Sequence, residues 1–115
     1  MTATHTATHT ASAFEQIIAE VTSWPGVSTA PGRRGELSLR LGRREIGHLH
    51  GDRSAHFNFP KAQWAQLHAQ GRIVEHPVFP GRVGPAARRI EGPADVADVI
   101  ELLRLNYDRL ARRNR

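Results

Sequence analysis

The chain is 115 residues long, carries a formal net charge of +5 and contains no cysteine. This length suits a single domain with one modest core. The absence of cysteine excludes disulfide bonds, thiolate metal ligands and a cysteine nucleophile, and it suits a reducing compartment, so we expect a cytoplasmic protein. We expect neither secretion nor membrane contact, because no stretch approaches the roughly 20 apolar residues that span a bilayer and no signal peptide is recognisable.

The N-terminal segment has a composition unlike the rest of the chain. Residues 1–11 contain the tetrapeptide Thr-Ala-Thr-His twice and, after Met1, no apolar side chain large enough to build a core. Such a segment cannot offset the entropy lost on folding. We therefore predict a disordered tail over residues 1–11 and a single domain over residues 12–115.

A short amphipathic helix opens the predicted domain. Residues 12–15, Ser-Ala-Phe-Glu, match a capping box, and apolar residues then recur at helical spacing as far as Val21. The run Trp-Pro-Gly at 24–26 ends this helix. Proline and glycine between residues 31 and 35 predict that a loop follows.

Three strands are predicted next, and they form a meander. Leucines alternate with polar residues over 37–41, which is typical of a half-buried strand, and a turn at Gly42 leads into a return strand over 45–50. Simple alternation along this return strand places Ile46, His48 and His50 on one face. A third alternating strand covers residues 55–59.

The C-terminal half predicts two helices and two strands. A short helix begins after Pro60 and is capped by Gly71, and weaker strand patterns occupy residues 72–76 and 86–91. A long apolar stripe then predicts a final helix from Pro93. The element order contains no βαβ repeat, so we predict an α+β fold: a mainly antiparallel sheet of about five strands with three helices packed on it.

Several sequence blocks resemble a known family. They are the run from Gly42 to Asp52, Gly-Arg-Arg-Glu-Ile-Gly-His-Leu-His-Gly-Asp, then Phe-Pro-Lys at 59–61, Glu-His-Pro at 75–77 and the closing block 102–109. Together they are similar to small bacterial proteins commonly labelled "luciferase domain", over roughly residues 37–110. The label implies little chemistry, because the chain is too short for the flavin-dependent luciferase barrel of about 250 residues.

The sequence departs from that family at one block and resembles a second group in its layout. Where family members often carry Ser-Gly-Trp, this chain has Arg-Val-Gly-Pro at 82–85, without the tryptophan. The order of elements and the pair Asn106-Tyr107 are also similar to MmcQ/YjbR-like proteins. That resemblance implies a compact α+β fold that is sometimes proposed to bind DNA.

Histidines on the second predicted strand are the sharpest local feature. His48-x-His50-x-Asp52 combines residue types that bind zinc or iron. Residues two positions apart on a strand point to the same face of the sheet. Gly51 is expected to end the strand before Asp52, so we favour structural histidines over a metal site and expect no metal and no cofactor. His56 and His76 could join the pair, whereas alternation places Glu45 on the opposite face.

Arginine pairs support a different interpretation. Fifteen of the sixteen basic residues are arginine, which binds phosphate and carboxylate groups through planar contacts. A nucleic-acid interface would use the hairpin tip, the second basic pair and the C-terminal tail: Arg43, Arg44, Arg88, Arg89, Arg112 and Arg113. Solvated surface arginines are the simpler alternative, because exposed aromatic residues do not alternate with these charges.

The sequence leaves more than one function open. The preferred hypothesis is a non-catalytic binding module whose pocket, lined by His48, His50, His76 and Tyr107, takes a small polar or anionic ligand or a partner protein. The alternative is nucleic-acid binding, and a metal-dependent enzyme at the same histidines ranks third. We assign no catalytic residues, because no nucleophile elbow, phosphate-binding loop or zinc-protease helix is present.

Overall fold

The computed structural model describes residues 11–113, which form three helices and one six-stranded sheet. This confirms the predicted α+β class. The tail predicted for residues 1–11 lies outside the described residues except for Ala11. The elements in chain order are α2 (Ala13–Val21), β1 (Val27–Pro31), β2 (Leu37–Leu41), β3 (Arg44–His50), β4 (Ser54–Asn58), α3 (Lys61–Ala69), β5 (Val74–Glu75), β6 (Pro85–Arg89) and α4 (Pro93–Arg113).

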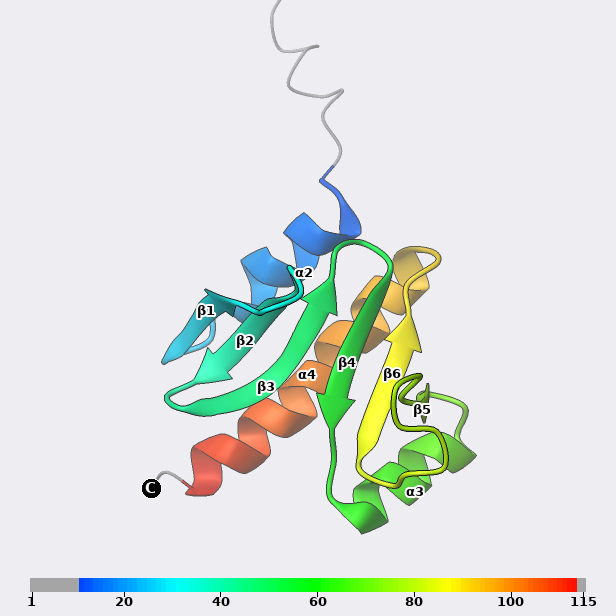
Figure 1. The fold of residues 1–115 in the computed structure, drawn as a ribbon. Helices are drawn as coiled ribbons and strands as arrows, with labels where there is room; N and C mark the ends of the chain where they lie inside the picture. The colour runs from blue at the N-terminus through cyan, green and yellow to red at the C-terminus, as the bar shows by residue number, and fades with distance from the viewer. Residues whose placement is uncertain (1–10, 114–115) are drawn as a thin grey trace, which may run out of the picture.

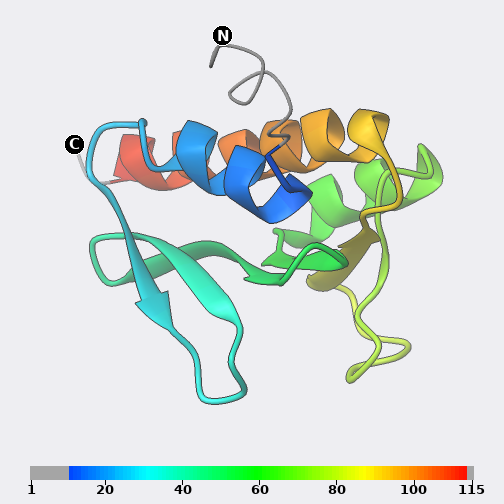
Figure 2. The ribbon, with the colours of Figure 1, turned by 90° about the horizontal axis from the view of Figure 1, so that it is seen from above.

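The sheet is antiparallel throughout and has helices on one side. Its strand order is β1-β2-β3-β4-β6-β5, so the predicted meander of β2, β3 and β4 forms its centre (Figure 1). Helices α2 and α4 lie against one face, as the view from above shows (Figure 2). Among residues 11–113, no helix covers the other face, and loops flank it instead.

The sheet has one strand more than the sequence predicts. Residues 27–31, for which the sequence predicts no strand, pair with β2 over their whole length, from Val27 opposite Leu41 to Pro31 opposite Leu37. This edge strand has no fully buried residue, so it lacks the apolar alternation that marks a half-buried strand. The predicted strand at 72–76 shortens to β5, and the one at 86–91 becomes β6.

The two caps predicted for the short helices are present. Ser12 and Glu15 form a reciprocal capping box at the start of α2. Gly71 adopts φ 73° directly after α3, a left-handed conformation that glycine takes without steric cost. Local sequence chemistry therefore determines where both helices begin or end.

Helix α4 supplies most of the packing against the sheet. Its apolar stripe is buried as predicted, including Val99 and Leu103, which are fully shielded from solvent. Asn106 is buried on the same side and donates hydrogen bonds from Nδ2 to the carbonyls of Ile46 and Asn58. Because β3 and β4 pair only over His48–His50 and Ser54–His56, Asn106 satisfies carbonyls at the point where these strands separate.

A β-bulge at Ile46 changes which side chains share a face. Leu39 pairs with Gly47 but Arg40 pairs with Glu45, so Ile46 is the extra residue. Ile46 and Leu49 are both buried in the core with α4. The prediction that Ile46 shares a face with His48 and His50 is therefore wrong, because simple alternation fails across a bulge.

Gly47 lies where the Leu103 side chain of α4 packs closely against β3. A Cβ atom built there would lie 2.6 Å from Leu103 Cδ2 and 3.0 Å from the carbonyl oxygen of His56. We predict that Gly47→Ala lowers the free energy of unfolding by about 1–3 kcal/mol, because the buried Leu103 side chain and the backbone of the neighbouring strand must both shift. Urea denaturation followed by circular dichroism measures the change.

Gly92 provides the matched control, because a Cβ atom there meets no atom within 4 Å. Gly92→Ala should change stability by no more than about 0.5 kcal/mol. In a Leu103→Ala background, the added methyl of Gly47→Ala gains space and should cost less than in the parent protein. Equal costs in the two backgrounds would contradict this account of Gly47.

Candidate functional site

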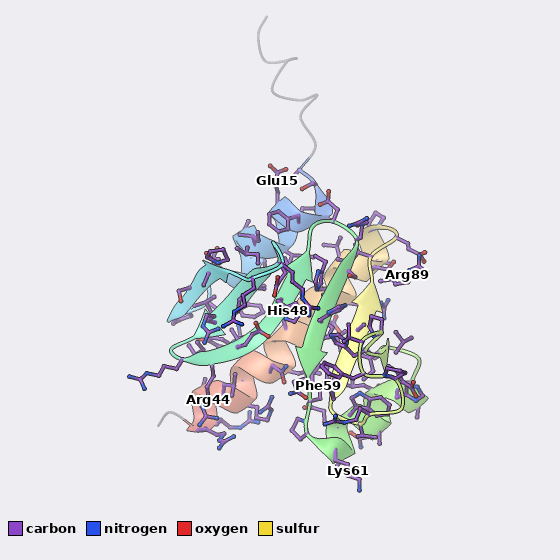
Figure 3. The ribbon with its side chains drawn as sticks, in the orientation of Figure 1. Glu15, Arg44, His48, Phe59, Lys61 and Arg89 are labelled. Atoms are coloured by element: carbon purple, nitrogen blue, oxygen red, sulfur yellow. The ribbon has the colours of Figure 1, made fainter. Side chains whose placement is uncertain are left out.

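Four histidines gather on the helix-free face of the sheet. His48 and His50 come from β3, His56 lies opposite His48 on β4, and His76 follows β5. Their rings pack against one another: the centroids of His50 and His56 are 4.3 Å apart and those of His56 and His76 are 4.2 Å apart. Figure 3 places His48 near the middle of the sheet. The structure thus brings together the three histidines that the sequence singled out as ligand-binding candidates.

Two loops form walls around this histidine cluster. The connection between β1 and β2 and the segment over residues 76–84 both project from the helix-free side (Figure 2). The first contributes Arg33, Arg34 and Glu36, and the second contributes Val78 and Phe79, to a hollow of about 330 Å³. We call this hollow the histidine pocket: its floor is His48, His50, His56 and His76, and its walls are these two loops.

Hydrogen bonds fix the orientation of the imidazole rings. His48 Nδ1 lies 3.0 Å from Glu45 Oε1, and the Ser38 hydroxyl donates to the other oxygen of the same carboxylate at 2.6 Å. His50 Nε2 and His56 Nδ1 are 3.1 Å apart. The Val78 amide donates to His76 Nδ1 at 3.1 Å. Each ring therefore has one nitrogen already engaged.

Glu45 belongs to this site, contrary to the prediction from strand alternation. The bulge at Ile46 returns Glu45 to the face of His48, where it forms an i,i+3 pair with that ring. His56 was noted in the sequence only as a possible addition, yet it lies at the centre of the cluster. Its sequence neighbours on β4, Ala55 and Phe57, face the core. Because side chains alternate along a strand, this assigns His56 to the helix-free face.

Burial keeps most of the cluster uncharged near neutral pH. Burial, followed by the neighbouring His76, His50 and His48, lowers the pKa of His56 to about 4. The pKa values of His50 and His76 are also lowered, by burial and then by His48. The hydrogen bond with His48 lowers the pKa of Glu45. Near neutral pH, the uncharged rings of His50, His56 and His76 thus lie beside His48 and the Glu45 carboxylate that engages it.

Two other candidate residues lie elsewhere. Tyr107 is on α4, on the opposite side of the sheet, where its hydroxyl donates to the Pro25 carbonyl at 2.7 Å and its ring packs against Trp24. Asp52 accepts the Phe14 amide at the start of α2. Neither residue lines the histidine pocket, so the structure does not extend the site along the His48-x-His50-x-Asp52 pattern.

The candidate nucleic-acid arginines do not form one surface. Arg88 is held by ion pairs with Asp95 and Asp98 and donates to the Arg72 carbonyl, so it is not free for a phosphate. Arg89 is exposed at the far end of β6. The remaining candidates lie in the β2–β3 turn and at the end of α4, and three of them, Arg44, Arg112 and Arg113, are close enough to Arg109 to lower its pKa. Arg43 precedes Arg44 in the turn.

Together the fold and the pocket define a small α+β domain that carries a histidine cluster on the open face of an antiparallel sheet. A family model described as the luciferase domain matches residues 43–106, more than half of the 115 residues, and the chain belongs to this family. The match spans all four histidines and Glu45. No curated protein and no solved structure matches the chain.

The likeness to MmcQ/YjbR-like proteins and a cytoplasmic location stay predictions. Within residues 11–113, no helix is both long enough and apolar enough to cross a bilayer. This agrees with the absence of any long apolar stretch in the sequence.

The low pKa of His56 predicts a loss of stability in acid. Because its pKa falls from 6.5 to about 4 on folding, the unfolded state binds the extra proton between these values, and stability falls as the pH falls through that window. In chelator-treated protein, acidification from about pH 7 to about pH 5 should cost on the order of 1–2 kcal/mol through this residue. Denaturant titrations at several pH values measure the loss.

His56→Asn provides the comparison, because an amide keeps a hydrogen-bonding group beside His50 and does not titrate. The variant should lose less stability than the parent over the same pH range. His68→Gln serves as the control, since His68 stacks on Trp64 of α3 outside the pocket. The same pH dependence in all three proteins would contradict the assignment to His56.

Proposed function

We propose that this luciferase-domain protein is a binding module whose histidine pocket takes a small anionic or polar ligand. The observation that carries the proposal is the convergence of four imidazoles, from two strands and a loop, at the base of a hollow with two arginines on its wall. Pockets that combine a few convergent polar groups with apolar walls are the usual form of small-molecule sites.

The charges around the pocket favour an anion. Within residues 11–113, Arg33 and Arg34 form no ion pair with any described carboxylate. Glu36 is occupied by the amide of Arg34, and Glu45 by Ser38 and His48. Both wall guanidinium groups are therefore available for a carboxylate or phosphate.

The second wall favours a ligand that also has an apolar part. Phe79 and Val78 are 43% and 55% exposed, and Phe79 packs beside His76. Exposed apolar side chains at the rim of a polar pocket gain free energy when a ligand covers them. An aromatic carboxylate contains both features, and benzoate is the simplest probe.

We predict that benzoate binds the chelator-treated protein and that Arg33→Gln with Arg34→Gln weakens binding at least tenfold, which is about 1.4 kcal/mol. Loss of the two guanidinium groups removes the charge that attracts the carboxylate. Isothermal titration calorimetry measures the affinity, with inorganic phosphate as a second probe that lacks the apolar part.

Arg112→Gln with Arg113→Gln is the matched control, because it removes the same charge at the end of α4, away from the pocket. It should leave benzoate binding unchanged. An equal loss in both double variants would show that net charge, and not the pocket, attracts the probe. No binding of either probe would refute the proposed function.

Nucleic-acid binding is a second candidate, supported by the cluster at the end of α4. Burial, followed by repulsion from Arg113, Arg44 and Arg112, lowers the pKa of Arg109, so these guanidinium groups lie close together. Arg44 and Arg109 also line a cavity of about 490 Å³ between β3 and α4. Like charges held together in this way favour a polyanionic partner.

If DNA binds there, affinity should fall with salt, with a log–log slope of about −0.9 for each neutralised phosphate of a duplex. Arg43→Gln with Arg44→Gln should flatten this slope, because two phosphate contacts are lost. Fluorescence anisotropy with a labelled duplex and a labelled single strand measures both effects. A signal independent of salt, or no binding at low salt, would exclude this candidate.

A further inference from the structure

We propose that His48, His56 and His76 bind a divalent transition metal, with Zn²⁺ as the best match. Each of the three rings offers a nitrogen, and these atoms lie within 4.8 Å of one another. Three imidazoles with an open fourth position are a common zinc ligand set. The inference deepens the proposed function and rests on it, because the metal would hold the anionic end of the pocket's ligand.

The spacing of the nitrogens is close to what zinc requires. Zinc–nitrogen bonds of about 2.1 Å in a tetrahedral site place the ligand atoms about 3.4 Å apart. The three nitrogens therefore need a modest inward movement from their present separation of at most 4.8 Å. His48 and His56 are held at a fixed spacing by the pairing of β3 and β4, and the ring of His76 already contacts that of His56.

The groups behind the ligands support a metal site. Glu45 engages Nδ1 of His48, which leaves Nε2 for the metal, and Ser38 holds that carboxylate in place. His50 engages Nδ1 of His56 and leaves its Nε2 free in the same way. A carboxylate or another acceptor behind a ligating histidine is typical of metal sites, where it sets the tautomer and the orientation of the ring.

His76 is the ligand that must rearrange. Its Nδ1 accepts the Val78 amide, which places its own proton on Nε2. Ligation through either nitrogen displaces that proton or that hydrogen bond, so metal binding exchanges one interaction of the ring for another. Ligation through Nδ1 would release the Val78 amide in the second wall, whereas ligation through Nε2 would leave that hydrogen bond in place.

The structure also removes the objection that the sequence raised against a metal. That objection concerned Asp52 as the third ligand, and Asp52 instead accepts the Phe14 amide in the first turn of α2. The ligand set crosses between strands, with His56 and His76 in place of Asp52. Within residues 11–113, Nε2 of His48 has no hydrogen-bond partner and the ring is partly exposed to the pocket, so a ligand can reach it.

The test is a zinc titration of the full chain in a His5→Gln, His9→Gln background, so that the N-terminal histidines do not compete for metal. We expect about one zinc ion per chain by metal analysis after dialysis, as a single three-histidine site requires. Glu45→Gln should weaken zinc binding about 10–100-fold, as loss of a group behind a ligand typically does. Calorimetry gives the affinities, and the absorption spectrum of the Co²⁺ form reports the ligand geometry.

His56→Asn should weaken zinc binding at least tenfold, and His68→Gln should leave it unchanged, because His68 stacks on Trp64 away from the pocket. Circular dichroism of each variant shows whether it is folded, and Glu45→Gln keeps the size of the side chain if His56→Asn unfolds. Failure of the parent background to retain zinc, or equal losses in Glu45→Gln and His68→Gln, would overturn the inference.

Benzoate separates this inference from the proposed function. If the metal-free protein binds benzoate and the zinc titration shows no binding, the proposed function is supported and the metal site is refuted. If zinc binds with the expected losses and strengthens benzoate binding, both stand. If zinc binds as an adventitious ion only, with no loss in Glu45→Gln and none in His56→Asn, the metal site is refuted.

Discussion

The bulge at Ile46 is the constraint on which the two faces of this sheet depend. It lets Ile46 and Leu49 both enter the core, although simple alternation would place residues three positions apart on opposite faces. It also returns Glu45 to the face of His48. Asn106 of α4 stabilises the same point by donating to the Ile46 carbonyl. Without the extra residue, either the core would lose an isoleucine or the histidines would lose their carboxylate.

The core contacts with α4 and the histidine pocket thereby lie on opposite faces of the same strands. On the helix side, Gly47 lets Leu103 approach the backbone of β3, and this close contact holds the strand against α4. On the other side, the cross-strand pair His48 and His56 takes its spacing from the backbone ladder. A floor built on a packed sheet is more precisely positioned than one built on loops. The loops supply only the walls.

The sequence was most informative where local chemistry decides the structure, as in the Ser12 cap of α2 and the apolar stripe of α4. It failed at β1, because an exposed edge strand has no burial pattern to detect. It misplaced Glu45, because nothing in a single sequence marks the one-residue register shift at Ile46. Three histidines of the pocket were identified, but Tyr107 was assigned to it from its helix alone, without knowledge of the face that α4 covers.

The cost of the histidine cluster argues that its role is not to stabilise the fold. Burial lowers the pKa of His56 to about 4, so the folded protein resists a proton that the unfolded chain accepts. The core does not require this ring, since Ala55 and Phe57 on the same strand make the contacts to the helix side. An apolar residue would avoid the penalty in acid. Imidazoles that converge at one point, one of them with a carboxylate behind it, are in contrast suited to bind a metal or a ligand, and this is the role we propose for the histidine pocket.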